Sequence, residues 1–157
     1  MKILFLDIDG VLNCQSMPRE DRIKTAGGLI SKRCLKLLNE LIDETDCKIV
    51  VSSTWRKDTS HDLFETLYNA GLRKESLIGK TPDFNTPYML RGNEIRAWLK
   101  MYATKNGVTS YAIADDDNDM LLWQAENFVA TDGWTGLTPS ITHRIKRVFN
   151  TIVYDGY

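Results

Sequence analysis

The hydrophobic pattern of the chain alternates between short apolar runs and longer amphipathic segments. The short runs lie at residues 2–7, 48–52, 110–114 and 128–131, and most of their positions are apolar in succession. Such continuous runs are typical of strands that are covered on both faces of a sheet. Leu77 and Ile78 predict one more short strand. Because amphipathic segments separate these runs, the sequence predicts a mainly parallel sheet with right-handed crossovers.

Four amphipathic segments with apolar residues at helical spacing predict helices. The first begins behind Ser31 and the last at Thr138, each a good N-cap residue, while the second is opened by Thr59 or Ser60 and closed by Gly71. The apolar stripes expected to be buried are Cys34, Leu35, Leu38, Leu41 and Ile42; Leu63, Phe64, Leu67 and Tyr68; Ile95, Trp98, Leu99 and Tyr102; and Ile141, Ile145, Val148 and Phe149.

Two segments, residues 13–28 and 79–90, show neither a helical nor a strand period and are rich in turn-forming residues. Neither is long enough to form a folded domain of its own. We therefore expect a single α/β domain over residues 1–157, without a sizeable cap domain. Residues 13–28 are expected to form a small flap-like loop.

The composition is that of an ordinary globular protein. The 157 residues are 43% hydrophobic and carry a net charge of −1, which excludes disordered classes and gives no overall attraction to nucleic acid or anionic membranes. No stretch approaches the ~20 apolar residues of a membrane span. We therefore expect a cytoplasmic location and no membrane partner. The three cysteines lack metal-ligand spacing, and Cys34 and Cys47 are expected to be small buried hydrophobic side chains.

Acidic residues follow two of the predicted strands, at the edge where a parallel sheet places its ligand site. Asp7 and Asp9 come after the first strand, and Gly10 lets the chain turn sharply beside them. Like charges this close repel one another unless a cation lies between them. Four more acids follow the run at 110–114, namely Asp115, Asp116, Asp117 and Asp119. Oxygen ligands of this kind suit a hard cation such as Mg²⁺.

Hydroxyl and basic residues complete the candidate site. Ser52 and Ser53 follow the second strand, where side-chain hydroxyls and free backbone N–H groups form phosphate cradles in many α/β proteins. Arg91 opens the third helix, although the helix dipole disfavours a positive charge at that end. This mismatch is explained either by an anionic partner near Arg91 or by an ordinary surface arginine.

These strand ends together resemble the motifs of the haloacid dehalogenase-like (HAD) superfamily of phosphotransferases. Phe5-Leu6-Asp7-Ile8-Asp9-Gly10-Val11-Leu12-Asn13 is similar to the first motif, Ser52 to the second, Arg91 to the third, and Ala114-Asp115-Asp116-Asp117-Asn118-Asp119 to the fourth. The stretches at 51–56, 91–99 and 131–138 resemble the small HAD domains associated with RNA repair, relatives of the phosphatase module of polynucleotide kinase-phosphatase. Val11 and Arg91 stand where many members have Thr and Lys. The resemblance implies a three-layer Rossmann-like fold.

The resemblance also implies a mechanism. Asp7 would attack phosphorus, and Asp9 would act as the acid and base. Ser52 and Arg91 would hold the phosphoryl group, with Gly10 and Ser53 beside them. Mg²⁺ would be bound by Asp7, by the backbone carbonyl of Asp9 and by Asp115, with either Asp116 or Asp119 in support. The expected activity is hydrolysis of a phosphomonoester through an aspartyl-phosphate on Asp7.

Without a cap the site is expected to be open. An open site suits a large substrate such as an RNA or DNA end, or requires closure by a partner protein or a second copy of the chain. Five basic residues would line a route for a phosphate backbone, or else form a solvated surface: Arg19, Arg22, Lys24, Lys32 and Arg33. Trp55 and Trp98 are expected to pack in the core.

Three alternatives stay open from the sequence. The first is a phosphatase of the same superfamily that acts on a small nucleotide. The second is a receiver-like module that accepts phosphate on Asp as a switch, against which the acid at Asp9 argues. The third is a binding module with a vestigial site.

Overall fold

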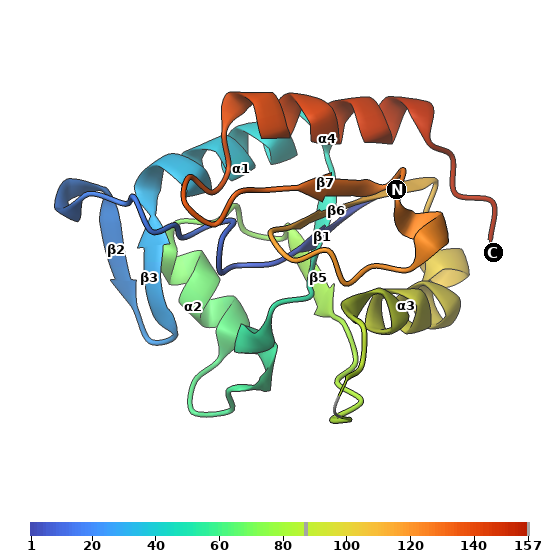
Figure 1. The fold of residues 1–157 in the computed structure, drawn as a ribbon, viewed down its shortest axis with the longest axis horizontal. Helices are drawn as coiled ribbons and strands as arrows, with labels where there is room; N and C mark the ends of the chain where they lie inside the picture. Colours follow the sequence, from blue (N-terminus) through green and yellow to red (C-terminus); the bar gives the residue numbers. More distant parts are fainter. Residues whose placement is uncertain (87, 157) are drawn as a thin grey trace.

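A five-stranded sheet forms the centre of the computed structural model, which describes residues 1–86 and 88–156 (Figure 1). The strands are β1 (Lys2–Leu6), β4 (Lys48–Val51), β5 (Leu77–Lys80), β6 (Ser110–Asp115) and β7 (Phe128–Ala130). Their order is β5-β4-β1-β6-β7, and every pairing is parallel. The predicted α/β fold with a parallel sheet is thus confirmed, including the short strand at Leu77.

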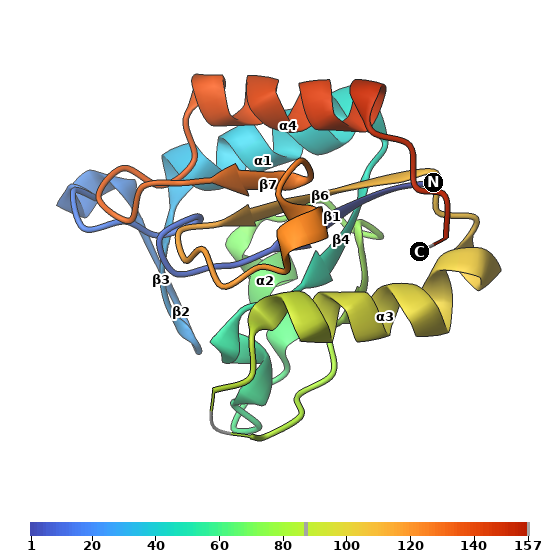
Figure 2. The same ribbon diagram turned by 45° about the vertical axis from the view of Figure 1, so that its right-hand side comes forward.

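Helices cover both faces of this sheet. Side chains of α1 (Lys32–Thr45), α2 (Leu63–Ala70) and α4 (Pro139–Thr151) pack in one apolar cluster with Leu4 and Leu6 of β1. Helix α3 (Arg91–Asn106) packs alone against the other face, where its Trp98 meets Phe5 edge to face. Figure 2 shows α1 and α4 above the sheet and α3 below it. The predicted three layers are present.

Most helix ends follow the local sequence. Ser31 accepts a hydrogen bond from the Cys34 backbone N–H, and Thr138 accepts one from Ile141, so both predicted N-caps are confirmed. The predicted start of α2 at Thr59 or Ser60 is wrong. Asp62 caps this helix, because its carboxylate accepts hydrogen bonds from two backbone N–H groups of the first turn. The predicted stripes are largely buried, but Tyr102 is exposed and lies tilted against the Trp98 ring.

The segment predicted as an irregular flap-like loop, residues 13–28, contains regular structure. A short 3₁₀ helix, η1 (Arg19–Asp21), leads into an antiparallel hairpin of β2 (Arg22–Thr25) and β3 (Gly28–Ser31). The sequence prediction missed the hairpin because each strand is only four residues long, too short for a clear period-2 signal. The hairpin still projects from the body of the protein, beside α1 and α2, as Figure 1 shows.

No cap domain is present among the described residues. Between β1 and α1 the chain inserts only η1 and the hairpin, and residues 81–86 and 88–90 before α3 form neither helix nor strand. Cys34, Cys47 and Trp98 are buried, as expected. Among the helices described, none is long and apolar enough to cross a membrane.

Candidate active site

Strand register brings the polar strand ends into one row. Leu6 of β1 is aligned with Val51 of β4 and with Ala114 of β6, so the next residues, Asp7, Ser52 and Asp115, are neighbours. Phe5, Val50 and Ile113, two positions earlier on each strand, all pack on the α3 face of the sheet. Because side chains alternate along a strand, the three polar side chains are directed to that same face.

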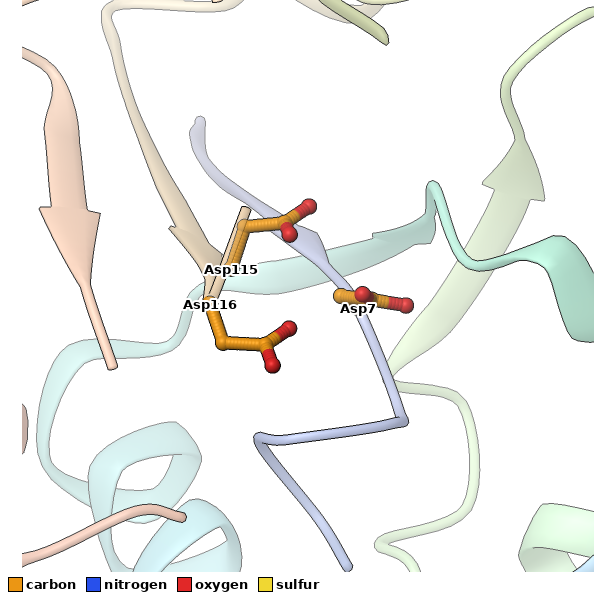
Figure 3. Close-up of side chains that lie close together, drawn as sticks. All are labelled: Asp7, Asp115 and Asp116. Carbon is orange, nitrogen blue, oxygen red and sulfur yellow. The ribbon is translucent and has the colours of Figure 1, made fainter. Parts of the chain in front are cut away.

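Three carboxylates gather at this edge. One oxygen each of Asp7, Asp115 and Asp116 lies within 4.8 Å of the others, and Figure 3 shows the three side chains side by side beyond β1 and β6. Asp7 and Asp115 are buried, whereas Asp116 is exposed. Asp116 fits only because Gly10 has no side chain: a Cβ there would lie 2.2 Å from its carboxyl carbon, and Gly10 also adopts a positive φ of 71°.

Arg91 provides the positive charge of the cluster. Its Nη1 lies 2.9 Å from Asp7 Oδ2 and 2.8 Å from Asp115 Oδ2. Burial raises the pKa of Asp115, the adjacent Asp7 raises it further, and it reaches about 8 although Arg91 opposes the shift. Burial and Asp7 also raise the pKa of Asp116. Burial alone would lower the pKa of Arg91, but its carboxylate neighbours raise it.

The first turn of α3, which carries Arg91, is held by a segment far along the chain. Asp119 Oδ2 accepts a hydrogen bond from the Arg91 backbone N–H at 3.0 Å, and the Asp119 carbonyl accepts one from Gly92. The Gln124 amide donates to the Gly92 carbonyl at 3.0 Å. Asp119 therefore caps α3 and lies outside the carboxylate cluster. The sequence left open whether Asp116 or Asp119 supports the metal. Of these two residues, Asp116 lies in the carboxylate cluster.

A buried ion pair holds the same turn of α3 from the other side. Arg56 lies in η2 (Thr54–Lys57) and pairs with Glu94, and both side chains are buried. Its guanidinium also donates to the carbonyls of Ser52 and Ser53, at 2.7 and 2.8 Å. Arg56 thereby fixes the turn after β4 relative to Arg91, a role that sequence reasoning missed.

Asp9 is held by two donors. Trp55 Nε1 donates to Asp9 Oδ2 at 3.0 Å, and Asn13 Nδ2 donates to Asp9 Oδ1 at 2.7 Å. The prediction that Trp55 is simply a core residue is therefore incomplete: its ring packs against the core, but its polar edge belongs to the site. A Cβ on Gly27 would lie 2.7 Å from the Trp55 ring, so the hairpin turn rests directly on the indole.

The predicted phosphate-binding residues differ in what they already bind. Ser52 Oγ is buried and has no hydrogen-bond partner, which leaves it available to a ligand. Ser53 Oγ accepts a hydrogen bond from the Trp55 backbone N–H, so it caps η2. The Gly10 N–H donates to Asn13. A ligand role for Ser53 and Gly10 stays a prediction.

Three of the five basic residues predicted to line a route for a phosphate backbone have structural partners, while for Arg19 and Lys24 the route stays a prediction. Arg22, Lys32 and Arg33 donate to backbone carbonyl groups of the surrounding loops. These three side chains thus serve the packing of the hairpin and α1, and the structure gives no support to a route along them.

Comparison with protein-family models gives one match, to the HAD domain in Swiss Army Knife RNA repair proteins, over residues 3–140. The chain belongs to this HAD family. The match covers the sheet, the three carboxylates and Arg91 together, and it confirms the resemblance read from the strand-end motifs. Searches of curated proteins and of solved structures return no match.

HAD domains generally use Mg²⁺, and the cluster of this HAD domain fits such an ion. Its donor atoms are all carboxylate oxygens, the ligands that hard cations prefer. Asp115 Oδ2 is buried and accepts no hydrogen bond, since the nearby Arg91 nitrogen meets it only as an ion contact. The Asp7, Asp115 and Asp116 carboxylates are therefore the candidate ligands. A contribution from the Asp9 carbonyl stays a prediction.

The HAD site opens into a polar cleft of about 180 Å³ between η2 and the loop that precedes α3. Arg91 and Asp119 line its inner end, and Thr54, Lys57 and Met89 line it farther out. The cleft thus adjoins the carboxylate cluster through Arg91, which contacts Asp7 and Asp115.

Proposed function

We propose that this HAD domain is a Mg²⁺-dependent phosphomonoester hydrolase that works through an aspartyl-phosphate on Asp7. The observation that carries the proposal is the meeting of Asp7, Arg91 and the unpartnered Ser52 hydroxyl beside two further carboxylates. A nucleophile, a cationic clamp and a metal-binding carboxylate set are the parts that phosphoryl transfer needs.

In the first half of the proposed reaction, a carboxylate oxygen of Asp7 attacks phosphorus as the bond to the leaving oxygen breaks. Asp9 gives its proton to that oxygen, so that an alcohol leaves and not an alkoxide. Ser52 Oγ and the Arg91 guanidinium bind the non-bridging oxygens and stabilise their charge in the transition state.

In the second half, Asp9 takes a proton from water as the water oxygen attacks phosphorus. The bond between phosphorus and Asp7 breaks, which releases inorganic phosphate and restores the Asp7 carboxylate. Trp55 and Asn13 hold the Asp9 carboxylate in place during both proton transfers. Bound between Asp7, Asp115 and Asp116, Mg²⁺ would supply positive charge that screens these carboxylates from the phosphate dianion.

A nucleic-acid terminal phosphate is the substrate class we propose. The family name points to RNA repair, and a site without a cap domain can admit the end of a long strand. A small nucleotide would be held by fewer contacts in such an open cleft.

The test is a phosphate-release panel with Mg²⁺. It compares an aryl phosphate, free nucleotides, and oligonucleotides with a 3′- or a 5′-phosphate, each with the wild-type protein and with Asp7→Asn. We expect release from at least one oligonucleotide end and none with Asp7→Asn. Full activity of Asp7→Asn would exclude the proposed nucleophile, and release from free nucleotides alone would favour the small-molecule alternative. A single turnover without further release would point to a switch.

A further inference from the structure

A second depression lies next to the catalytic cleft, along the outer face of α3. Its volume is about 420 Å³, and its lining is Phe84, Met89, Asn93, Arg96, Ala97 and Lys100, which we call the α3 groove. Met89 lines both the α3 groove and the catalytic cleft that reaches Arg91, so the two are adjacent. A volume of this size lies within the range of roughly 300–1,000 Å³ that is usual for organic ligands.

The α3 groove differs in charge from the rest of the molecule. Its lining holds two cations, Arg96 and Lys100, and no carboxylate, although the whole chain has a net charge of −1. The cations of the catalytic cleft itself have acidic partners, as Lys57 has Asp83 and Arg56 has Glu94. Arg96 and Lys100 therefore give the α3 groove a local preference for anions.

The lining also offers flat apolar surface. Phe84 and Met89 are partly exposed there, and Asn93 adds an amide that can pair with a polar edge. Just beyond the groove, Arg96 lies over the ring of Trp123, which is half exposed. Single-stranded nucleic acid binds to surfaces of this kind. Its bases stack on aromatic and apolar side chains, and its phosphates contact guanidinium and ammonium groups.

The helix sets the direction of this surface. The groove residues of α3 are spaced three or four positions apart and therefore lie on one face of the helix: Asn93, Arg96, Ala97 and Lys100. At 1.5 Å per residue, Arg96 and Lys100 lie about 7.5 and 13.5 Å along the axis from Arg91. A strand whose terminal phosphate lies at Arg91 thus meets positive charge again farther along α3.

We propose that the α3 groove binds the nucleotides next to the terminal phosphate of a single-stranded nucleic acid. This inference rests on the proposed phosphatase function for its position, but its test needs no turnover. Bases stack on Phe84 and Met89 while backbone phosphates contact Arg96 and Lys100. The groove thereby gives the catalytic site its preference for a polynucleotide over a free nucleotide.

Binding of a fluorescent single-stranded RNA octamer without terminal phosphates tests the proposal by anisotropy over a range of salt concentrations. With Arg96→Gln/Lys100→Gln we expect about tenfold weaker binding, and the log–log salt slope should fall by about 1.4, at ~0.7 per lost phosphate contact. Phe84→Ala should weaken binding about tenfold through lost stacking. Lys105→Gln, an exposed charge change at the end of α3 outside the groove, is the matched control.

Equal binding by the double variant and the wild-type protein, or no binding by the wild type, would overturn the proposal. Poly-glutamate that competes as well as unlabelled RNA would also overturn it, since the groove would then recognise charge alone. Failure of the catalytic proposal gives a different result. In that case the wild-type protein binds the octamer, and the double variant binds it more weakly, but no substrate in the phosphate-release panel is hydrolysed.

Discussion

Replacing Trp55 by Phe tests whether the indole positions the proposed acid and base. The substitution keeps an aromatic ring against the core and under the hairpin turn but removes the N–H that donates to Asp9 Oδ2 at 3.0 Å. Asn13 still holds the other oxygen of Asp9. The variant should therefore fold, while the Asp9 carboxylate becomes free to rotate away from the leaving oxygen.

The expected loss follows from the energy of one hydrogen bond to a charged group, about 1.5–3 kcal/mol. At about 1.4 kcal/mol per factor of ten, this corresponds to a roughly 10- to 100-fold lower kcat/KM. The size of the loss should depend on the leaving group. An alkyl phosphate needs a proton from Asp9 as its oxygen leaves and should show the full loss, whereas p-nitrophenyl phosphate releases a stable phenolate and should show little.

The assay is kcat/KM for both substrates, which reports the steps up to departure of the leaving group. Trp134→Phe, the same change at an exposed indole, is the control and should leave both values unchanged. The reasoning is refuted if Trp55→Phe lowers kcat/KM equally for both substrates, because a general disturbance of the site would have that effect. An unchanged kcat/KM for the alkyl phosphate would refute it as well.

Three further predictions concern charge in the site. In a chelator, the free energy of unfolding should fall as the pH rises from about 4 to about 8. In that window the folded protein, with the pKa of Asp115 raised to about 8, retains a proton that the unfolded chain has lost. In urea titrations, Asp115→Asn should lack this contribution to the dependence of the unfolding free energy on pH. Mg²⁺ at ~100 times its Kd should stabilise the wild type by about 2.7 kcal/mol in thermal unfolding, and Asp116→Asn should lose most of this gain while Asp119→Asn keeps it. Arg56→Met should lower the free energy of unfolding by about 3–5 kcal/mol because it leaves a buried carboxylate unpaired. Arg73→Met, at an exposed ion pair, should show a much smaller loss in the same urea titration.

The sheet was predictable because its strands are buried on both faces. Ile49, Val50 and Val51 follow one another without a polar residue, and an uninterrupted run of β-branched residues in so short a segment is typical of a buried parallel strand. The hairpin at residues 22–31 was not predictable in the same way, since its four-residue strands bury only Ile30 and Ser31 fully. The start of α2 was misplaced because residues 59, 60 and 62 are all possible caps, and only the folded turn selects Asp62.

The strand-end residues of the site were predictable for a related reason. A parallel register places Asp7 and Asp115 at the same edge of the sheet, whatever the conformation of the loops that follow. The residues that position them come from tertiary contacts that have no local signature. Asp119 caps a helix that begins 28 residues earlier, and Trp55 reaches Asp9 across 46 residues. In the sequence alone, Asp119 resembles a metal ligand and Trp55 resembles a core residue.

The two flanks of the site differ in what covers them, and this difference bears on how water would be excluded from a HAD site without a cap domain. On one flank, the hairpin backbone at Gly27 lies directly on the Trp55 ring, although the hydrogen bond from Trp55 to Asp9 is itself exposed. On the other flank, the cleft beside Arg91 is open and lies next to the α3 groove. Because electrostatic interactions strengthen when water leaves, a substrate that fills this open flank improves its own catalysis. A strand long enough to occupy the α3 groove would do so, and a free nucleotide would not, so chain length should act on kcat as well as on KM.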